Sequence, residues 1–138
     1  MGGVSNEATP GGAGPAAALA GLLIVSGCAH LTRPEPFDAI VPRALPGRAR
    51  WWTYASGVAE LATGAAVALP RTRSRGAACA AGLFLSVLPA NVQMAADWRD
   101  RTPPLRALAY GRLPLQAPLV LWALRVHRTA RARDAAPR

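Results

Sequence analysis

Hydrophobic residues along the chain gather into four blocks, separated by short segments rich in Pro and Arg. The blocks cover about residues 15–31, 51–69, 76–96 and 105–127. A helix of about 20 mostly apolar residues is long enough to cross a lipid bilayer. The pattern therefore predicts an all-α protein, a bundle of four transmembrane helices.

The segment between the first two blocks is too short and too rich in proline to form a domain of its own. Residues 34–41 are expected to form about two helical turns that place Phe37, Ile40 and Val41 on one side. We expect this short interfacial segment to lie over the mouth of the bundle. In the third block, Pro89 is expected to kink the helix beside Asn91.

The remaining residues divide into a Gly-rich N-terminal tail, 1–14, a membrane domain, 15–128, and a basic C-terminal tail, 129–138. Both tails are predicted to be disordered. Residues 25–28 resemble a bacterial lipoprotein cleavage site. The residues before them contain Glu7 and no Lys or Arg, which favours a retained helix over a cleaved signal peptide.

Small residues at helical spacing predict two faces for close helix packing. In the second block, Ser56 and Gly64 lie one turn on either side of Glu60. In the third block, Gly82, Ser86 and Ala90 follow at every fourth position. Stripes of this kind let membrane helices approach one another closely.

All 16 basic residues of the 138-residue chain are arginines, and the net charge is +9. Such a charge is also found in nucleic-acid-binding proteins. Here the arginines flank the apolar blocks and no zinc-finger spacing accompanies them, so we expect the lipid bilayer, not a nucleic acid, to be the partner.

The arginines also predict the orientation. Four spans put the N-terminus, the turn at 71–75 and the C-terminal tail on one side, with eight arginines against seven on the other. The turn at 71–75 is tight and strongly basic, which favours the cytoplasm for both termini. The predicted location is the cell membrane, crossed several times.

Glu60 is the one carboxylate in the middle of the second block. A charge at this depth is costly unless it faces other protein groups or takes up a proton. The helical rise places Arg112 and Gln116 of the fourth block at a similar depth. Asn91 and Gln93 are expected near the outer end of the third block, and His30 at the outer end of the first block.

Arg112 is the expected partner of Glu60, because a guanidinium holds a carboxylate with two hydrogen bonds. Two interpretations of this polar group stay open. It is either a ligand pocket formed by Glu60, Arg112, Asn91, Gln116 and His30, or a cluster that only locks the helices together. His30 taken alone is more typical of a residue at the membrane interface.

Other kinds of chemistry receive little support. Cys28 and Cys79 are too far apart in depth to form a disulfide. No metal site, haem site or common catalytic motif is present, and the sequence leaves open whether the protein is an enzyme.

Three short motifs occur in order: Ser-Gly-x-x-Glu at 56–60, Pro-Ala-Asn at 89–91 and Arg-Leu-Pro-Leu-Gln at 112–116. In this order the chain resembles the DoxX-like family of small bacterial membrane proteins, over about residues 15–128. The resemblance implies a four-helix membrane bundle and a loose link to redox chemistry, since the family is named after a subunit of a thiosulfate:quinone oxidoreductase. The chain lacks the paired cysteines that a thiol relay needs.

Two functions are therefore expected. The first is an accessory or quinone-proximal subunit of a membrane redox system, with a polar pocket in the outer half of the bundle. Quinone is the one cofactor suggested, and a redox enzyme subunit or quinone is the suggested partner. The alternative is a non-catalytic membrane module that stabilises a partner protein. A solute carrier is disfavoured because four spans show no inverted repeat.

Overall fold

The computed structural model describes residues 12–136, which form helices joined by turns and contain no β-strand. The predicted all-α class is confirmed. The helices are α1 (Ala13–Thr32), α2 (Glu35–Asp38), α3 (Ala49–Ala68), α4 (Arg73–Ser86), α5 (Leu88–Asp97) and α6 (Pro103–Asp134).

The third hydrophobic block forms two helices, where one kinked helix was predicted. α4 ends at Ser86 and α5 begins at Leu88, with Pro89 in the first turn of α5. Proline lacks an N–H group and its ring clashes with the carbonyl one turn earlier, so a helix is interrupted just before it. The break sets the direction of α5, which carries Asn91.

The boundaries of both predicted tails need correction. α6 continues through residue 134, so most of the segment 129–138 is helical, because Val126 and Ala130 extend the buried stripe of this helix. At the other end, α1 already begins at Ala13, within the predicted tail 1–14. Residues 1–11 and 137–138 of these tails lie outside the described residues.

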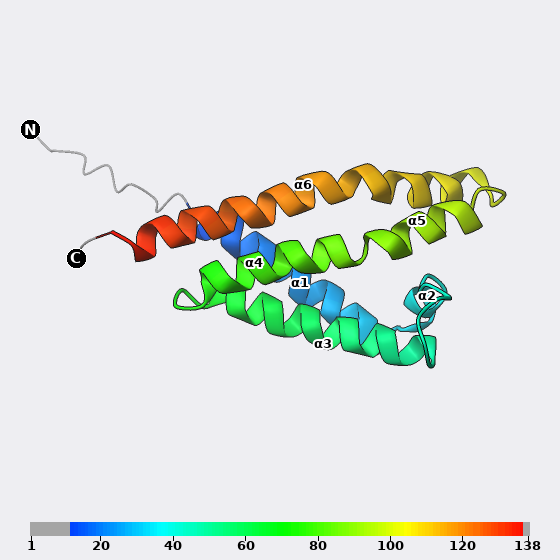
Figure 1. Ribbon diagram of the computed structural model, residues 1–138, viewed down its shortest axis with the longest axis horizontal. Helices are drawn as coiled ribbons and strands as arrows, with labels where there is room; N and C mark the ends of the chain where they lie inside the picture. The colour runs from blue at the N-terminus through cyan, green and yellow to red at the C-terminus, as the bar shows by residue number, and fades with distance from the viewer. Residues whose placement is uncertain (1–11, 137–138) are drawn as a thin grey trace, which may run out of the picture.

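The long helices run side by side, and α1 begins at the same end of the bundle where α6 ends (Figure 1). α1 packs mainly against α3, while α4 and α5 pack against α6. The contact between α3 and α4 joins these two sets of helices. α2 and the turn between α5 and α6 lie at the opposite end of the molecule (Figure 1).

The hydrophobic core is built largely from small residues. Ala16, Ala77, Ala80 and Ala123 are fully buried, together with larger side chains such as Leu19. Side chains this small let the helix axes approach closely. The predicted stripe that begins in α4 is different: Gly82 is exposed, and among the described residues nothing lies within 4 Å of a Cβ added there, so Gly82 makes no close helix contact.

Two helical stretches are long and apolar enough to cross a membrane, α1 and the α4–α5 unit, Arg73–Asp97. This finding rests on length and composition alone. Polar side chains, such as Glu60 in α3 and Arg112 in α6, lower the mean hydropathy of the other two long helices.

Candidate functional site

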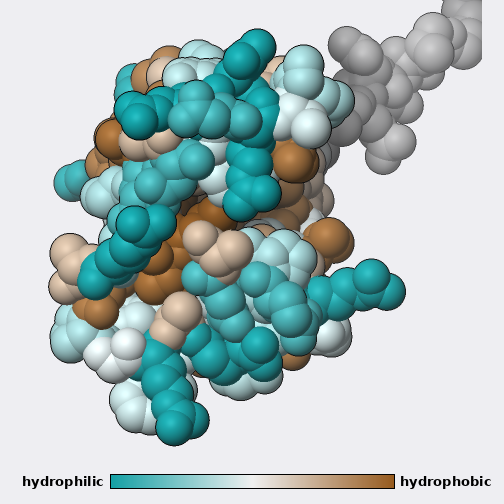
Figure 2. All heavy atoms as spheres, turned by 90° about the vertical axis from the view of Figure 1, so that its right-hand side faces the viewer, coloured by the Kyte–Doolittle hydropathy of each residue, from teal (hydrophilic) through white to brown (hydrophobic). Residues whose placement is uncertain are grey.

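A cavity of about 310 Å³ lies between the helices in the half of the bundle that faces α2. All five residues predicted to form a pocket line it: His30, Glu60, Asn91, Arg112 and Gln116. They come from α1, α3, α5 and α6, so no single helix builds the site. Figure 2 looks at this end of the molecule and shows hydrophobic atoms in a hollow between groups of hydrophilic side chains.

Apolar side chains form most of the remaining wall. They include Leu22 and Leu23 of α1, Phe84 of α4 and Leu119 of α6, and the segment between α2 and α3 adds Ile40. A cavity of this size with an apolar wall and a few polar groups is typical of a site for a small molecule.

Glu60 is paired with His30 of α1. His30 Nδ1 lies 3.1 Å from Glu60 Oε2 and 2.8 Å from the carbonyl oxygen of Ser26, and both side chains are about six-sevenths buried. The imidazole ring also stacks on Phe37, with 3.8 Å between the ring centroids. His30 is therefore a part of the cavity wall and is held on two sides.

The predicted ion pair between Glu60 and Arg112 is absent from the described residues. Arg112 instead donates a hydrogen bond from Nε to Oδ1 of Asn91, at 3.0 Å. Asn91 is almost fully buried, so this bond fixes the guanidinium at the cavity surface. The Nε bond leaves the terminal guanidinium nitrogens available to other groups, and none of the hydrogen bonds among residues 12–136 uses them.

Two acceptor atoms at the cavity have no hydrogen-bond partner within the described part of the chain. They are Oε1 of Gln116 and Oε2 of Glu60, whose 3.1 Å contact with His30 Nδ1 is an ion-pair contact without hydrogen-bond geometry. Buried polar groups in native proteins nearly always have a partner, which is often water or a ligand. These two oxygen atoms can therefore accept hydrogen bonds from water or from a ligand.

A strap formed by residues 39–48 covers part of the cavity between α2 and α3. Its residues Ile40, Val41, Pro42 and Leu45 line the cavity. The predicted segment over the bundle mouth is therefore present, although its helical part, α2, has one turn and not two.

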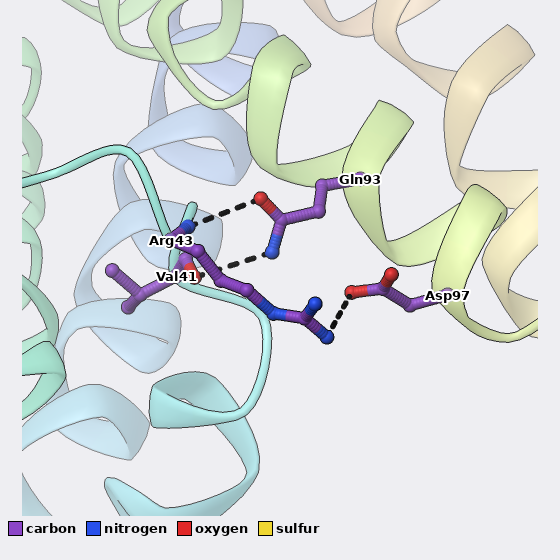
Figure 3. Close-up of polar contacts among 4 residues, drawn as sticks. All are labelled: Val41, Arg43, Gln93 and Asp97. Atoms are coloured by element: carbon purple, nitrogen blue, oxygen red, sulfur yellow. Dashed lines mark hydrogen bonds and ion pairs between the residues drawn. The ribbon is translucent and has the colours of Figure 1, made fainter.

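The strap is attached to α5 by the side chains shown in Figure 3. The amide of Gln93 accepts a hydrogen bond from the backbone N–H of Arg43 at 3.1 Å and donates one to the carbonyl of Val41 at 3.4 Å. The guanidinium of Arg43 also lies 3.3 Å from Asp97. The expected depth of Gln93 groups it with the pocket residues. In the structure Gln93 instead attaches the strap to α5.

The other end of the strap is attached to α3 through Asp38. Its carboxylate accepts hydrogen bonds from Arg50 Nε at 2.7 Å and from Thr53 Oγ1 at 2.6 Å. Burial alone would raise the pKa of Asp38, but the hydrogen bonds from Thr53 and Arg50 and the positive charge of Arg50 lower it below its ordinary value. Asp38 therefore stays ionised as an anchor.

Sequence reasoning missed several of these roles. Phe37 was placed on an apolar face, but nothing in the sequence indicated that it stacks on His30. Asp38 and Thr53 were not singled out, because a hydrogen bond across 15 positions follows from the path of the chain and leaves no local motif.

Cys28 and Cys79 are both free, which agrees with the prediction that they form no disulfide. Residues 12–136 contain no group of three His, Cys, Asp or Glu side chains that could hold a metal ion.

Comparison with known proteins gives a family but no activity. No curated protein and no solved structure matches the chain. A family described as a domain of unknown function, DUF8561, matches residues 19–127, which include every residue of the cavity wall. Since this match covers most of the chain, the protein belongs to the DUF8561 family.

Proposed function

We propose that the protein is a multi-pass cell-membrane protein of the DoxX-like type whose cavity binds a small amphiphilic molecule, with quinone as the leading candidate. In this proposal α1, α3, the α4–α5 unit and α6 are the four spans. The protein would serve as an accessory subunit of a membrane redox system and would hold quinone close to a redox enzyme.

The exposure of apolar residues supports a membrane location. Only 28% of the apolar window in α1 and 33% of that in α4–α5 is buried inside the protein. The core helix of a water-soluble protein would be mostly buried. Val25, Val58, Leu85 and Leu121, one on each long helical unit, are all more than half exposed, as side chains facing lipid tails would be.

The packing of α1 favours a retained span over a signal peptide. Leu19 and Leu23 of α1 are almost fully buried in the core, and Trp122 of α6 donates a hydrogen bond to the carbonyl of Pro15. A segment removed after export would not be needed to complete the core of the mature protein.

The cavity is the observation on which the binding proposal depends. Its apolar wall suits a ring system or a short hydrocarbon chain, and its polar groups come from four helices. Arg112 is positioned to donate hydrogen bonds to a carbonyl oxygen, since Asn91 holds only its Nε. Quinone is proposed as the ligand because the motifs at 56–60, 89–91 and 112–116 resemble those of DoxX-like proteins.

The test is binding of naphthoquinone to the protein purified in detergent, measured by isothermal titration calorimetry. Arg112→Ala should weaken binding by about tenfold or more, as expected for loss of a hydrogen bond from a charged donor. Arg106→Ala provides the control, because Arg106 is exposed on the same helix and lies outside the cavity wall. Equal affinity in the wild type and Arg112→Ala, or no binding at all, would disprove the proposal.

A further inference from the structure

The two acceptor atoms without partners indicate which chemical form of a ligand fits the cavity. Gln116 is 7% exposed and its Oε1 has no donor among the described residues. Oε2 of Glu60, on a different helix, also has no hydrogen-bond donor among the described residues. Both residues line the same cavity, and both oxygen atoms are buried in its wall.

The contact with His30 does not satisfy Glu60. Nδ1 of His30 carries at most one hydrogen and lies closer to the carbonyl of Ser26, at 2.8 Å, than to Glu60 Oε2, at 3.1 Å. When that hydrogen points at Ser26, the carboxylate oxygen receives no well-aligned hydrogen bond. A donor from the occupant would complete it.

The charges at the cavity favour a neutral occupant. Glu60 and Arg112 contribute opposite charges to the same wall, so neither sign of net charge on a ligand is favoured by both groups. A hydroxyl group suits both, because it donates to an acceptor such as Gln116 Oε1 and accepts from the guanidinium of Arg112.

From these observations we infer that the cavity prefers a neutral ring bearing hydroxyl groups, and hence the quinol over the quinone. The inference rests on the proposed function, since it names the form of the ligand for the same site. A quinone offers only carbonyl acceptors and would leave Glu60 Oε2 and Gln116 Oε1 without donors. Sites built around hydrogen bonds to a hydroxyl discriminate strongly against analogues that lack it.

The experiment compares naphthohydroquinone with naphthoquinone by anaerobic isothermal titration calorimetry on the wild-type protein. We expect the hydroquinone to bind at least about tenfold more tightly. Gln116→Met removes one acceptor at nearly constant size and should reduce this ratio. Leu115→Met introduces the same side chain at the adjacent, exposed position outside the cavity wall and should leave the ratio unchanged.

The outcomes separate this inference from the proposed function. Equal binding of both compounds, or tighter binding of the quinone, overturns the preference but leaves the quinone site intact. Binding of neither compound overturns both. A ratio that stays at the wild-type value in Gln116→Met also overturns the assignment of the acceptor. If this variant fails to fold, the wild-type ratio alone still decides the preference.

Discussion

At the scale of single residues, glycines set how closely α1 and α3 approach. A Cβ atom added at Gly27 would lie 2.8 Å from the carbonyl oxygen of Gly57 and 2.8 Å from the Leu61 side chain. A Cβ at Gly57 would lie 2.9 Å from Cβ of His30. Since His30 packs over Gly57, one turn before Glu60, this close contact also brings the imidazole to the carboxylate.

Gly27→Ala should therefore separate the two helices locally and destabilise the protein by about 1–3 kcal/mol, the usual cost of overpacking. Gly21→Ala on the same helix is the control, because nothing lies within 4 Å of an added Cβ there. Alanine in place of an exposed helical glycine should instead stabilise by up to about 1 kcal/mol. Thermal unfolding in detergent, followed by tryptophan fluorescence, measures both, and equal midpoints for the two variants would contradict the packing argument.

Asp38 makes stability depend on pH in a predictable direction. Because its pKa is lower in the folded protein than its ordinary value of 3.8, its hydrogen bonds stabilise the fold above that pH and are lost as the pH falls through the lower, folded value. Asp38→Asn should reduce the loss of stability on acidification below about pH 3.8. The unfolding midpoint as a function of pH is the measurement. Asp100→Asn, at an exposed carboxylate paired with its neighbour Arg99, should behave like the wild type.

At the scale of elements, the strap 39–48 contains no buried residue, unlike the long helices that form the rest of the cavity wall. It is attached through Asp38 on one side and through Gln93 and Asp97 of α5 on the other. Segments with few buried contacts open more readily than helices in the core. We therefore expect the strap to open more readily than the helices that form the rest of the cavity wall.

Gln93→Ala removes both amide hydrogen bonds to the strap and should speed hydrogen exchange at Val41 and Leu45 several-fold, with α1 and α3 unchanged. Asp97→Ala removes only the ion pair with Arg43. The Arg43 side chain is 82% exposed, and exposed pairs contribute little, so this variant should have the smaller effect. Exchange measured by mass spectrometry tests this order, and a larger effect of Asp97→Ala would show that the amide is not the main attachment.

A second feature of the elements is the turn between α3 and α4, which the sequence marked only as a basic loop. Arg73 donates hydrogen bonds to the carbonyls of Val67 and Ala68, and the hydroxyl of Thr72 donates to Ala66. These donors satisfy the last carbonyls of α3, which have no partner within their own helix. The turn therefore caps the C-terminal end of α3, and it also carries a cluster of positively charged arginines.

At the scale of the whole molecule, the proposed four spans lead to a definite topology. α6 has 32 residues and is about 48 Å long, so it exceeds the hydrocarbon core, about 30 Å thick, and would project from the membrane at its Arg-rich end. Both the start of α1 and the end of α6 lie at this end of the bundle (Figure 1).

Alkaline phosphatase fused after residue 47 or 101 should be active, and fusions after residue 74 or at the C-terminus should be inactive, because the enzyme folds only outside the cytoplasm. The protein should also stay with the membrane after alkaline carbonate extraction. The opposite pattern of activity would reverse the proposed orientation, and extraction into the soluble fraction would contradict a membrane location.

The sequence by itself determined the helical class, the positions of the long helical units and a set of polar residues that line one cavity. Each of these predictions uses only the hydrophobic pattern and the helical rise within one segment of the chain. They therefore do not depend on how the helices are arranged in space. The same reasoning located the interruption near Pro89 and the segment that covers the cavity.

Only the tertiary structure decided which of these polar residues meet. Equal depth made Arg112 the expected partner of Glu60, but depth does not say which helix lies beside α3. The close packing of Gly27 on Gly57 brings α1 next to α3, so Glu60 meets His30, while the break before α5 turns Asn91 toward Arg112. Partner choice follows from the packing of helix on helix, which no single segment of the chain encodes.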